Sequence, residues 1–579
     1  MSAPIENCIP LPDLQIFRQL SRDQLVLCLE SIPGRKDLVL EPGLMRLLDR
    51  IAGASLLKQH GVDKIFKFEG KPIRHGNDQR LYLVRPDIET VKQIAEHIAA
   101  DKTAGKERVY RIILVPRKTF LCENLLEQEG VHGYVTLDQY CPNFLPLDSD
   151  LLSLEMPGFF RSFFLDGDQT YVHTVADALI NLQSVFGTIP NVYAIGNCSK
   201  MVYDMMETLR EDRGAPAALK NEIGHLVLID RDVDYITPLC SQLTYEGLLD
   251  EIFGINSGYC DFGPEVMGKD QTIRLLLTCQ DEVFDDIRNR HFSGVFNFLS
   301  TKAKELASDY EKRKNLATVG EMKDFVANKL KALKAQHKSL ALHIGASEHI
   351  INVKAKTDFE EHLRTEHSLL DTSQIKENIA YIEEAINRQY PLMQSLRLLC
   401  LMSQVLNGLP KNDYEGLTTQ FLQSHGFEHM LTFLNLKKLG LLTEQEPSKT
   451  VDSMIKTGKM TAAGAKVATT VASAIPRTTS NYSQVCRKLN LIPKIEEVDL
   501  KNATDMSYVF SGAFTPITCR LVEKILAKEG FDGLDDVMKL LPGPKFCNIK
   551  AKSVKDYRFI IATTAIITGT RLLEGVMES

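Results

Sequence analysis

The sequence lacks most of the signatures by which common enzyme classes are recognised. It has no tryptophan, and aromatic residues make up only 7% of it, which gives little support for a sugar-binding platform. A G-x-x-x-x-G-K-[ST] loop is absent, since the nearest fragment, Gly105-Lys106, has no upstream glycine to cradle a phosphate. The H-E-x-x-H and G-x-S-x-G motifs are missing as well. The sequence therefore predicts a protein that is not an enzyme and needs no cofactor.

Paired cysteines, a secretory leader and a membrane span are also missing. The twelve cysteines are scattered from Cys8 to Cys547 without a C-x-x-C pair, which argues against zinc or a disulfide framework and fits a reducing, cytosolic compartment. The start of the chain has no basic-then-apolar pattern, so no signal peptide is expected. The apolar run 559–567 is far shorter than the ~20 residues that span a bilayer. Any membrane association is expected to be peripheral.

Length and charge narrow the possibilities further. A chain of 579 residues, 44% of them hydrophobic, is expected to form several domains with sizeable cores. Its formal net charge of −7 argues against a general nucleic-acid binder.

The first part of the chain alternates between strand and helix patterns. Short apolar runs at 81–86 and 109–116 end in proline and predict buried strands. Between them, 87–100 carries apolar residues on one helical face, and 130–136 offers another strand. This order predicts a parallel sheet covered by helices. The loop 140–148, with two prolines, is expected to end the first domain.

The pattern becomes mostly helical from about residue 268. The segment 452–480 is rich in Ala, Thr, Ser and Gly, and is interpreted as a flexible linker. The run 559–567 predicts one more buried strand. Because a lone strand needs partners, it is expected to return to the sheet that begins near Leu226.

Three aspartates follow that strand at alternate positions. The run 226–229 has no polar break and suits a strand buried on both faces. If the chain stayed extended, Asp230, Asp232 and Asp234 would face one side at the carboxyl end of the sheet, where ligands usually bind, and would suit Mg²⁺. The alternative interpretation is that they cap the next helix and pair with Arg231 or other basic groups.

The segment DRDVDYITPLCSQLTYEGLLDEIFGI, residues 230–255, resembles the hallmark of the SM family, the Sec-one/Munc-eighteen-like chaperones of SNARE assembly in membrane fusion. Segments 164–196, 391–442 and 505–520 extend the likeness to nearly the whole chain. The resemblance implies a three-domain arch: two parallel-sheet, Rossmann-like α/β domains and one inserted, α-rich domain. It also implies an architectural role, without chemistry, for the motif residues Asp230, Arg231, Asp232, Asp234, Pro238, Tyr245, Glu246, Gly512 and Pro516.

The domain boundaries follow from both arguments. The predicted domains are an N-terminal α/β domain (1–145), a discontinuous second α/β domain (146–267 and 500–579) and a mostly helical third domain (268–499) with a SNARE-facing arm.

The resemblance implies a chaperone of SNARE assembly in endosomal and lysosomal vesicle tethering, docking and fusion. The expected partners are syntaxin-like SNAREs, assembled SNARE bundles and a Vps-sixteen-like helical-solenoid protein. The expected location is cytoplasmic and peripheral on late endosome, lysosome and recycling endosome membranes. In the first domain, Lys58 and Arg85 lie in the region that, by resemblance, binds a syntaxin-like SNARE in family members. Two alternatives remain open: a Mg-dependent transferase or hydrolase at the three aspartates, and a pure scaffold that binds only the solenoid protein.

The arm, residues 302–338, is the candidate surface for SNARE bundles. It contains ten Lys or Arg and five Asp or Glu, a formal charge of +5 in an acidic protein. Its tip includes Lys312, Arg313 and Lys314. A basic helix can steer acidic helical partners into contact, although a charged run can also be a solvated face.

The sequence departs from the family pattern near its end. Family members have a strand and a following helix before the last strand, whereas here 541–556 runs almost directly into Tyr557. The tether 547–556 offers no apolar strand. We therefore expect a second sheet that lacks a strand: either the last strand moves into the vacant position, or it leaves an open edge beside the strand 223–229.

Overall fold

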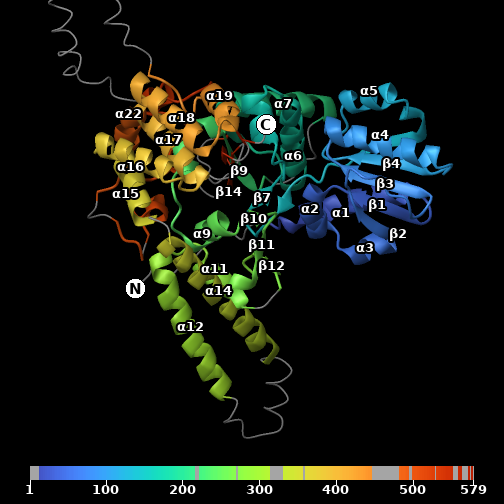
Figure 1. The fold of residues 1–579 in the computed structure, drawn as a ribbon, viewed down its shortest axis with the longest axis horizontal. Coiled ribbons are helices and arrows are strands. Elements are labelled where there is room, and N and C mark those ends of the chain that lie inside the picture. Colours follow the sequence, from blue (N-terminus) through green and yellow to red (C-terminus); the bar gives the residue numbers. More distant parts are fainter. Residues whose placement is uncertain are drawn as a thin grey trace, which may run out of the picture.

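In the computed structural model, two sheets rich in parallel strands and a helical lobe lie side by side, and a two-helix arm projects from them (Figure 1). The predicted combination of α/β parts with an α-rich part is confirmed. The structure describes residues 12–214, 221–268, 271–312, 330–356, 359–445, 481–494, 498–501, 503–528, 530–551, 558–563, 572–573 and 576–577.

The N-terminal sheet is fully parallel, with the strand order β2-β1-β3-β4-β5. Its strands are β1 (Lys36–Leu40), β2 (Val62–Lys67), β3 (Gln79–Val84), β4 (Val109–Leu114) and β5 (Val135–Gln139), and its helices are α1 (Gln15–Glu30), α2 (Met45–Ile51), α3 (Ala54–Gln59), α4 (Ile88–Thr103) and α5 (Phe120–Gln128). The predictions for 81–86, 87–100 and 109–116 are confirmed. The strand expected at 130–136 is confirmed only at its end, since β5 begins at Val135: Tyr134 N–H donates to Val131 O at 2.9 Å and closes a 3-10 turn before it.

The second sheet has the order β13-β8-β9-β14. Its strands are β8 (Asn191–Ile195), β9 (Ile223–Ile229), β13 (Lys545–Ile549) and β14 (Arg558–Thr563), and α6 (Thr170–Phe186) and α7 (Asn197–Arg213) pack beside it. The expected return of the last strand is confirmed, since β14 runs parallel to β9 with Ile560 opposite Leu226. Residues 564–567 of that predicted strand lie outside the described residues.

The tether 547–556 was expected to supply no apolar strand, but its first three residues lie in a strand of mixed polarity. Residues 547–549 belong to β13, which pairs antiparallel with β8. Two side chains hold it: Asn191 Oδ1 accepts from the backbone N–H groups of Lys550 and Ala551, and the Phe546 ring lies 4.5 Å from that of Tyr203. Contacts with Asn191 and Tyr203 therefore stabilise this strand of mixed polarity, and the residues of β13 alone do not predict them.

The remaining elements are mostly helical. They are β6 (Leu145–Pro146), β7 (Leu152–Ser153), α8 (Ile236–Leu239), α9 (Tyr245–Ile252), β10 (Ile255–Asn256), β11 (Tyr259–Phe262), α10 (Pro264–Met267), β12 (Ile273–Leu276), α11 (Glu282–Ile287), α12 (Phe292–Lys312), α14 (Leu330–Lys356), α15 (Phe359–Leu370), α16 (Ile375–Asn387), α17 (Leu392–Leu406), α18 (Lys411–His425), α19 (Met430–Lys438), α22 (Asn481–Leu489), α23 (Ile517–Lys528) and α24 (Asp535–Met538). The linker predicted at 452–480 lies outside the part of the chain that the structure describes.

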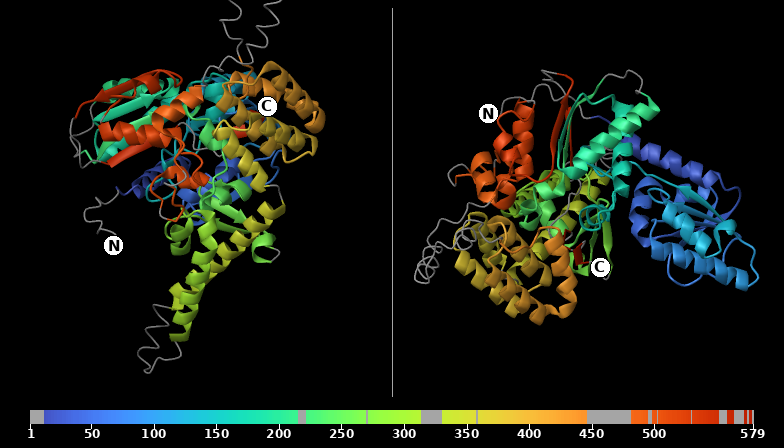
Figure 2. Two further views of the ribbon diagram at one scale, coloured as in Figure 1. Left: turned by 90° about the vertical axis from the view of Figure 1, so that its left-hand side faces the viewer. Right: turned by 90° about the horizontal axis from the view of Figure 1, so that it is seen from above.

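The hydrophobic cores group the parts of the molecule differently from the sheets. The second sheet and the helical lobe share one core, in which Val227 and Ile229 of β9 belong to the same cluster as Leu399 of α17. The N-terminal sheet has cores of its own. Figure 2 shows this domain and the lobe at opposite sides of the molecule, with the α12–α14 arm projecting away from both.

Polar contacts join the N-terminal domain to the small sheet β10-β11-β12. Arg46 pairs with Asp261 at 2.6 Å, and Tyr259 OH donates to Asp49 at 2.8 Å. A cavity of about 330 Å³ lies at this junction, with Arg50 among its lining residues. The N-terminal helix α1 also packs on the second domain, because Leu14 and Phe17 belong to one buried cluster with Leu182 and Phe186 of α6.

Candidate functional site

The chain does not stay extended after β9, so the predicted row of carboxylates is wrong. Residues Arg231–Val233 form a 3-10 turn. Asp230 is 1% exposed and accepts hydrogen bonds from Cys198 N at 2.8 Å, Ser199 N at 2.7 Å and Ser199 Oγ at 2.6 Å. These donors belong to the first turn of α7. Asp230 therefore caps a helix that precedes it in sequence, rather than the next one.

A glycine makes this cap possible. Gly196 precedes α7 with φ +112°, and a Cβ there would lie 2.2 Å from Asp230 Cγ. Burial raises the pKa of Asp230, and the hydrogen bonds from Ser199 and Cys198 oppose that rise. In Rossmann-like sheets this helix N-terminus binds phosphate. Here the protein's own carboxylate fills it.

Asp234 caps two other helices. It accepts from Thr237 N at 3.0 Å and Thr237 Oγ at 2.6 Å at α8, and from Thr518 N at 3.4 Å at α23. Arg231 donates to the Asp234 backbone carbonyl. Asp234 thus links the hallmark segment to a helix almost three hundred residues later, where Pro516 is buried just before α23.

Asp232 is the exception among the three. Its Oδ1 is buried and accepts no hydrogen bond from any described residue. Burial, followed by the charge of Asp230, raises the pKa of Asp232 to about 6, while a backbone hydrogen bond and the charges of Arg231 and Lys545 oppose that rise. Within the described residues, no group of three or more His, Cys, Asp or Glu side chains could hold a metal ion. The geometry thus offers the magnesium alternative no site.

The other motif residues join separate segments. Tyr245 OH lies 2.8 Å from His343 Nδ1 on α14, and Glu246 accepts from Arg288 Nε at 2.9 Å. Pro238 is buried within α8. Gly512 has φ +83°, and a Cβ there would meet the Val498 side chain at 2.6 Å. The motif is therefore a junction between the second sheet, the arm and the lobe.

Sequence reasoning missed the acidic and basic partners of this junction. Arg397 is 4% exposed in α17; it pairs with Glu251 at 2.7 Å and donates to Leu239 O at 3.2 Å. Glu366 accepts from Ser241 N at 2.9 Å. Burial opposes its ionisation, but His362 and Arg397 bring the pKa of Glu366 to about 2. The signal was available: a charged residue amid the apolar run of α17 needs a buried partner.

The predicted partner-binding residues are not brought together by the described structure. Lys58 is exposed on α3, whereas Arg85 is half-buried and pairs with Glu41 at 2.6 Å. Lys312 ends α12, and its side chain, Arg313 and Lys314 lie outside the described residues. Their contact with SNAREs stays a prediction.

A second surface was not predicted. Phe427, Met430, Leu431 and Leu434, here called the apolar stripe, are 67%, 58%, 56% and 51% exposed. Their spacing places them on one face of α19 and the turn before it. Apolar patches of this kind mark protein interaction sites.

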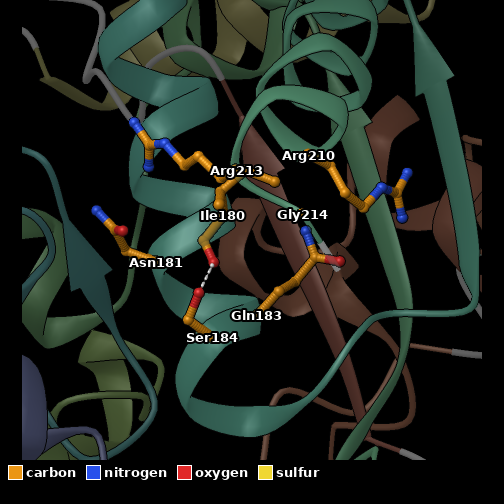
Figure 3. Close-up of a pocket in the computed structure, with 7 residues that line it drawn as sticks. All are labelled: Ile180, Asn181, Gln183, Ser184, Arg210, Arg213 and Gly214. Carbon is orange, nitrogen blue, oxygen red and sulfur yellow. Dashed lines mark hydrogen bonds between the residues drawn. The ribbon is translucent and has the colours of Figure 1, made fainter. Parts of the chain in front are cut away.

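A cavity of about 240 Å³ lies between α6 and the end of α7 (Figure 3). Of its two arginines, Arg213 pairs with Asp177 at 2.5 Å and Arg210 pairs with Glu207. Their charges are thus already compensated, and the cavity is assigned no role.

The comparisons with known proteins agree on one family. A model described as the Sec1 family matches residues 36–548. Vacuolar protein sorting-associated protein 33B of Mus musculus is 46% identical over 606 aligned positions, which cover 98% of each chain. Protein 33A of Rattus norvegicus is 34% identical, covering 92% of this chain and 86% of the relative.

Solved structures of similar fold support the predicted arch. The Unc18–syntaxin 1 complex from Monosiga brevicollis has a TM-score of 0.56 and 17% identity, and the match covers 97% of this chain and 99% of that one. The SM protein Vps45 in complex with the Qa SNARE Tlg2 has a TM-score of 0.53 and 13% identity, covering 96% and 97%. No described helix is both long and apolar enough to cross a bilayer. With a family model along most of its length and relatives of nearly full coverage, the chain belongs to the Sec1, or SM, family.

Proposed function

We propose that this chain is an SM-type chaperone of SNARE assembly in endosomal and lysosomal vesicle tethering, docking and fusion. The observation that carries the proposal is the α12–α14 arm, a two-helix projection whose residues 302–338 carry a formal charge of +5, on a protein that SM relatives match over 98% of its length (Figure 2). The proposed function is non-enzymatic, because Asp230 and Asp234, two of the three carboxylates at the sheet's ligand position, cap helices. The protein acts in the cytoplasm, peripherally on late endosome, lysosome and recycling endosome membranes, through its partners.

Two surfaces would bind SNAREs, one an assembled bundle and the other a single syntaxin-like SNARE. Lys312, the last residue of α12, and Arg313 and Lys314, which follow it in the sequence, would attract acidic faces of an assembled SNARE bundle. Lys58, exposed on the N-terminal domain, and Arg85, near it, would contact a syntaxin-like SNARE. The distance between these surfaces would set the register in which the helices assemble.

The apolar stripe fits the Vps-sixteen-like solenoid protein. An exposed Phe and three exposed aliphatic side chains at helical spacing suit the apolar face of a partner helix. A permanently bound partner would shield these apolar side chains from water, which explains why they can remain on the surface of the isolated chain.

Pull-down with assembled and unassembled SNAREs, with and without the solenoid protein, tests the function. Replacing Lys312, Arg313 and Lys314 by Glu should weaken capture of the assembled bundle. The matched control reverses Lys92, Lys501 and Lys528, which are exposed elsewhere and give the same change in net charge. Full capture by the arm variant would leave the arm as solvated surface. Absence of SNARE capture by the wild type under every condition would favour the pure scaffold.

A further inference from the structure

The short helix α11 touches the arm at its N-terminal end. Asp281, which precedes α11, accepts from Ser339 Oγ at 2.6 and 2.7 Å and lies 3.3 Å from His343 Nε2. Both partners are on α14. Burial raises the pKa of Asp281, but the hydrogen bonds from His343 and Ser339 outweigh this effect and lower the pKa to about 2. A charged carboxylate therefore holds α14 at two positions one turn apart.

The other end of α11 touches the segment that leaves the N-terminal domain. Arg288, directly after α11, donates to Asp148 at 2.5 Å and to Glu246 on α9 at 2.9 Å. Only 4% of the Asp148 side chain is exposed, and it also accepts from Cys279 N at 3.1 Å. Arg288 is thus the basic partner of a buried carboxylate at the domain junction.

A continuous row of side chains joins the two ends. The Arg288 guanidinium lies 5.2 Å from the centre of the Phe284 ring, and that ring stacks on His343 at 5.9 Å. His343 in turn meets the edge of Tyr245 at 5.6 Å. Phe284 and His343 are fully buried. Because buried side chains are close-packed, α14 cannot rotate without disturbing this row.

The arm helix is fixed from its opposite side as well. A Cβ at Gly345 would lie 2.2 Å from Val266 O, so α14 packs directly on the backbone of α10. On the other arm helix, Lys302 pairs with Asp286 of α11 at 3.1 Å. Both arm helices therefore take their position from α11 and its surroundings.

We propose that α11 is a strut, with Asp281, His343 and Arg288 as positioning residues, that holds the arm at a fixed distance from the N-terminal domain. The two SNARE-contacting surfaces then keep one spacing, and SNARE helices meet them in register. The fixed distance stands on its own, whereas its effect on SNAREs rests on the proposed function.

Pulsed electron–electron distance measurement on the full chain tests the strut without SNAREs. Spin labels are placed at Glu107 and Lys304, both exposed, through genetically encoded amino acids because Cys547 is exposed. His343→Ala and the milder Ser339→Ala remove contacts at the arm end. Asp285→Asn, an exposed change in the same helix, is the matched control. Thermal melting of each variant identifies any that fails to fold.

The wild type and the control should give one narrow distance distribution. His343→Ala should at least double its width, Ser339→Ala should widen it less, and affinity for an assembled SNARE bundle should fall roughly five- to tenfold. An unchanged distribution in folded variants overturns the strut. Lost SNARE binding with an unchanged distribution also overturns it, because position is then not what these residues control. Wild type with a narrow distribution but no SNARE affinity contradicts the proposed function and leaves the strut intact.

Discussion

Replacing Asp232 by Asn should stabilise the protein at neutral pH. Its Oδ1 is buried without a described hydrogen-bond partner, and its pKa rises from the ordinary 3.8 to about 6. A group with a raised folded pKa binds more protons in the folded state, so stability falls as the pH rises from 3.8 to about 6 and the loss persists above it. A shift of about two pH units corresponds to ~2.7 kcal/mol, which solvent screening of this partly exposed side chain reduces to ~1–2 kcal/mol.

The measurement is urea unfolding of the full chain at pH 7 and at an acidic pH just above 4. The Asp232→Asn change should raise the free energy of the first transition at pH 7, and the difference from wild type should shrink at the acidic pH, where Asp232 is protonated. Asp234→Asn is the matched control. Its carboxylate accepts from Thr237 and Thr518, so the same change should destabilise by about 1–3 kcal/mol at neutral pH. Destabilisation by Asp232→Asn at pH 7 would refute the reasoning and show that the charges of Arg231 and Lys545 stabilise the Asp232 carboxylate.

Further predictions concern the cap, the last strand and the two partner surfaces. Asp230→Ala should lower the unfolding free energy by roughly 1–3 kcal/mol in urea titration, through a lost cap, and remove no catalytic activity. By hydrogen-exchange mass spectrometry, β14 should exchange faster than β4, because β4 pairs on both sides and β14 with one described strand; equal protection would contradict this. Leu431→Asp should abolish pull-down of the solenoid protein at an unchanged melting temperature, and retained capture would place that partner elsewhere. In binding titrations, added salt should weaken SNARE-bundle binding by wild type more than by the arm variant.

The sequence was sufficient where local pattern decides the structure. Apolar periodicity located β3, α4 and β4, and an isolated apolar run identified β14 and its partner sheet. It was insufficient for the aspartates, because the donors that Asp230 caps lie some thirty residues upstream and the 3-10 turn after it breaks the assumed alternation. The partner of Arg397 is likewise 146 residues away. Pairings across such separations depend on tertiary packing that periodicity does not contain.

The cap at the start of α7 also decides whether that helix N-terminus can bind a free ligand. A carboxylate carried on the adjacent strand stands before those amides at an effective concentration on the order of millimolar or higher, and it never diffuses away. Any free phosphate would have to displace a competitor that is covalently attached. The Asp230 carboxylate therefore occupies the helix N-terminus permanently, in the space that Gly196 leaves free. Because this site is always filled, its occupancy does not change with the concentration of a metabolite. The second sheet therefore keeps one structure and supports the protein-binding surfaces in a fixed arrangement.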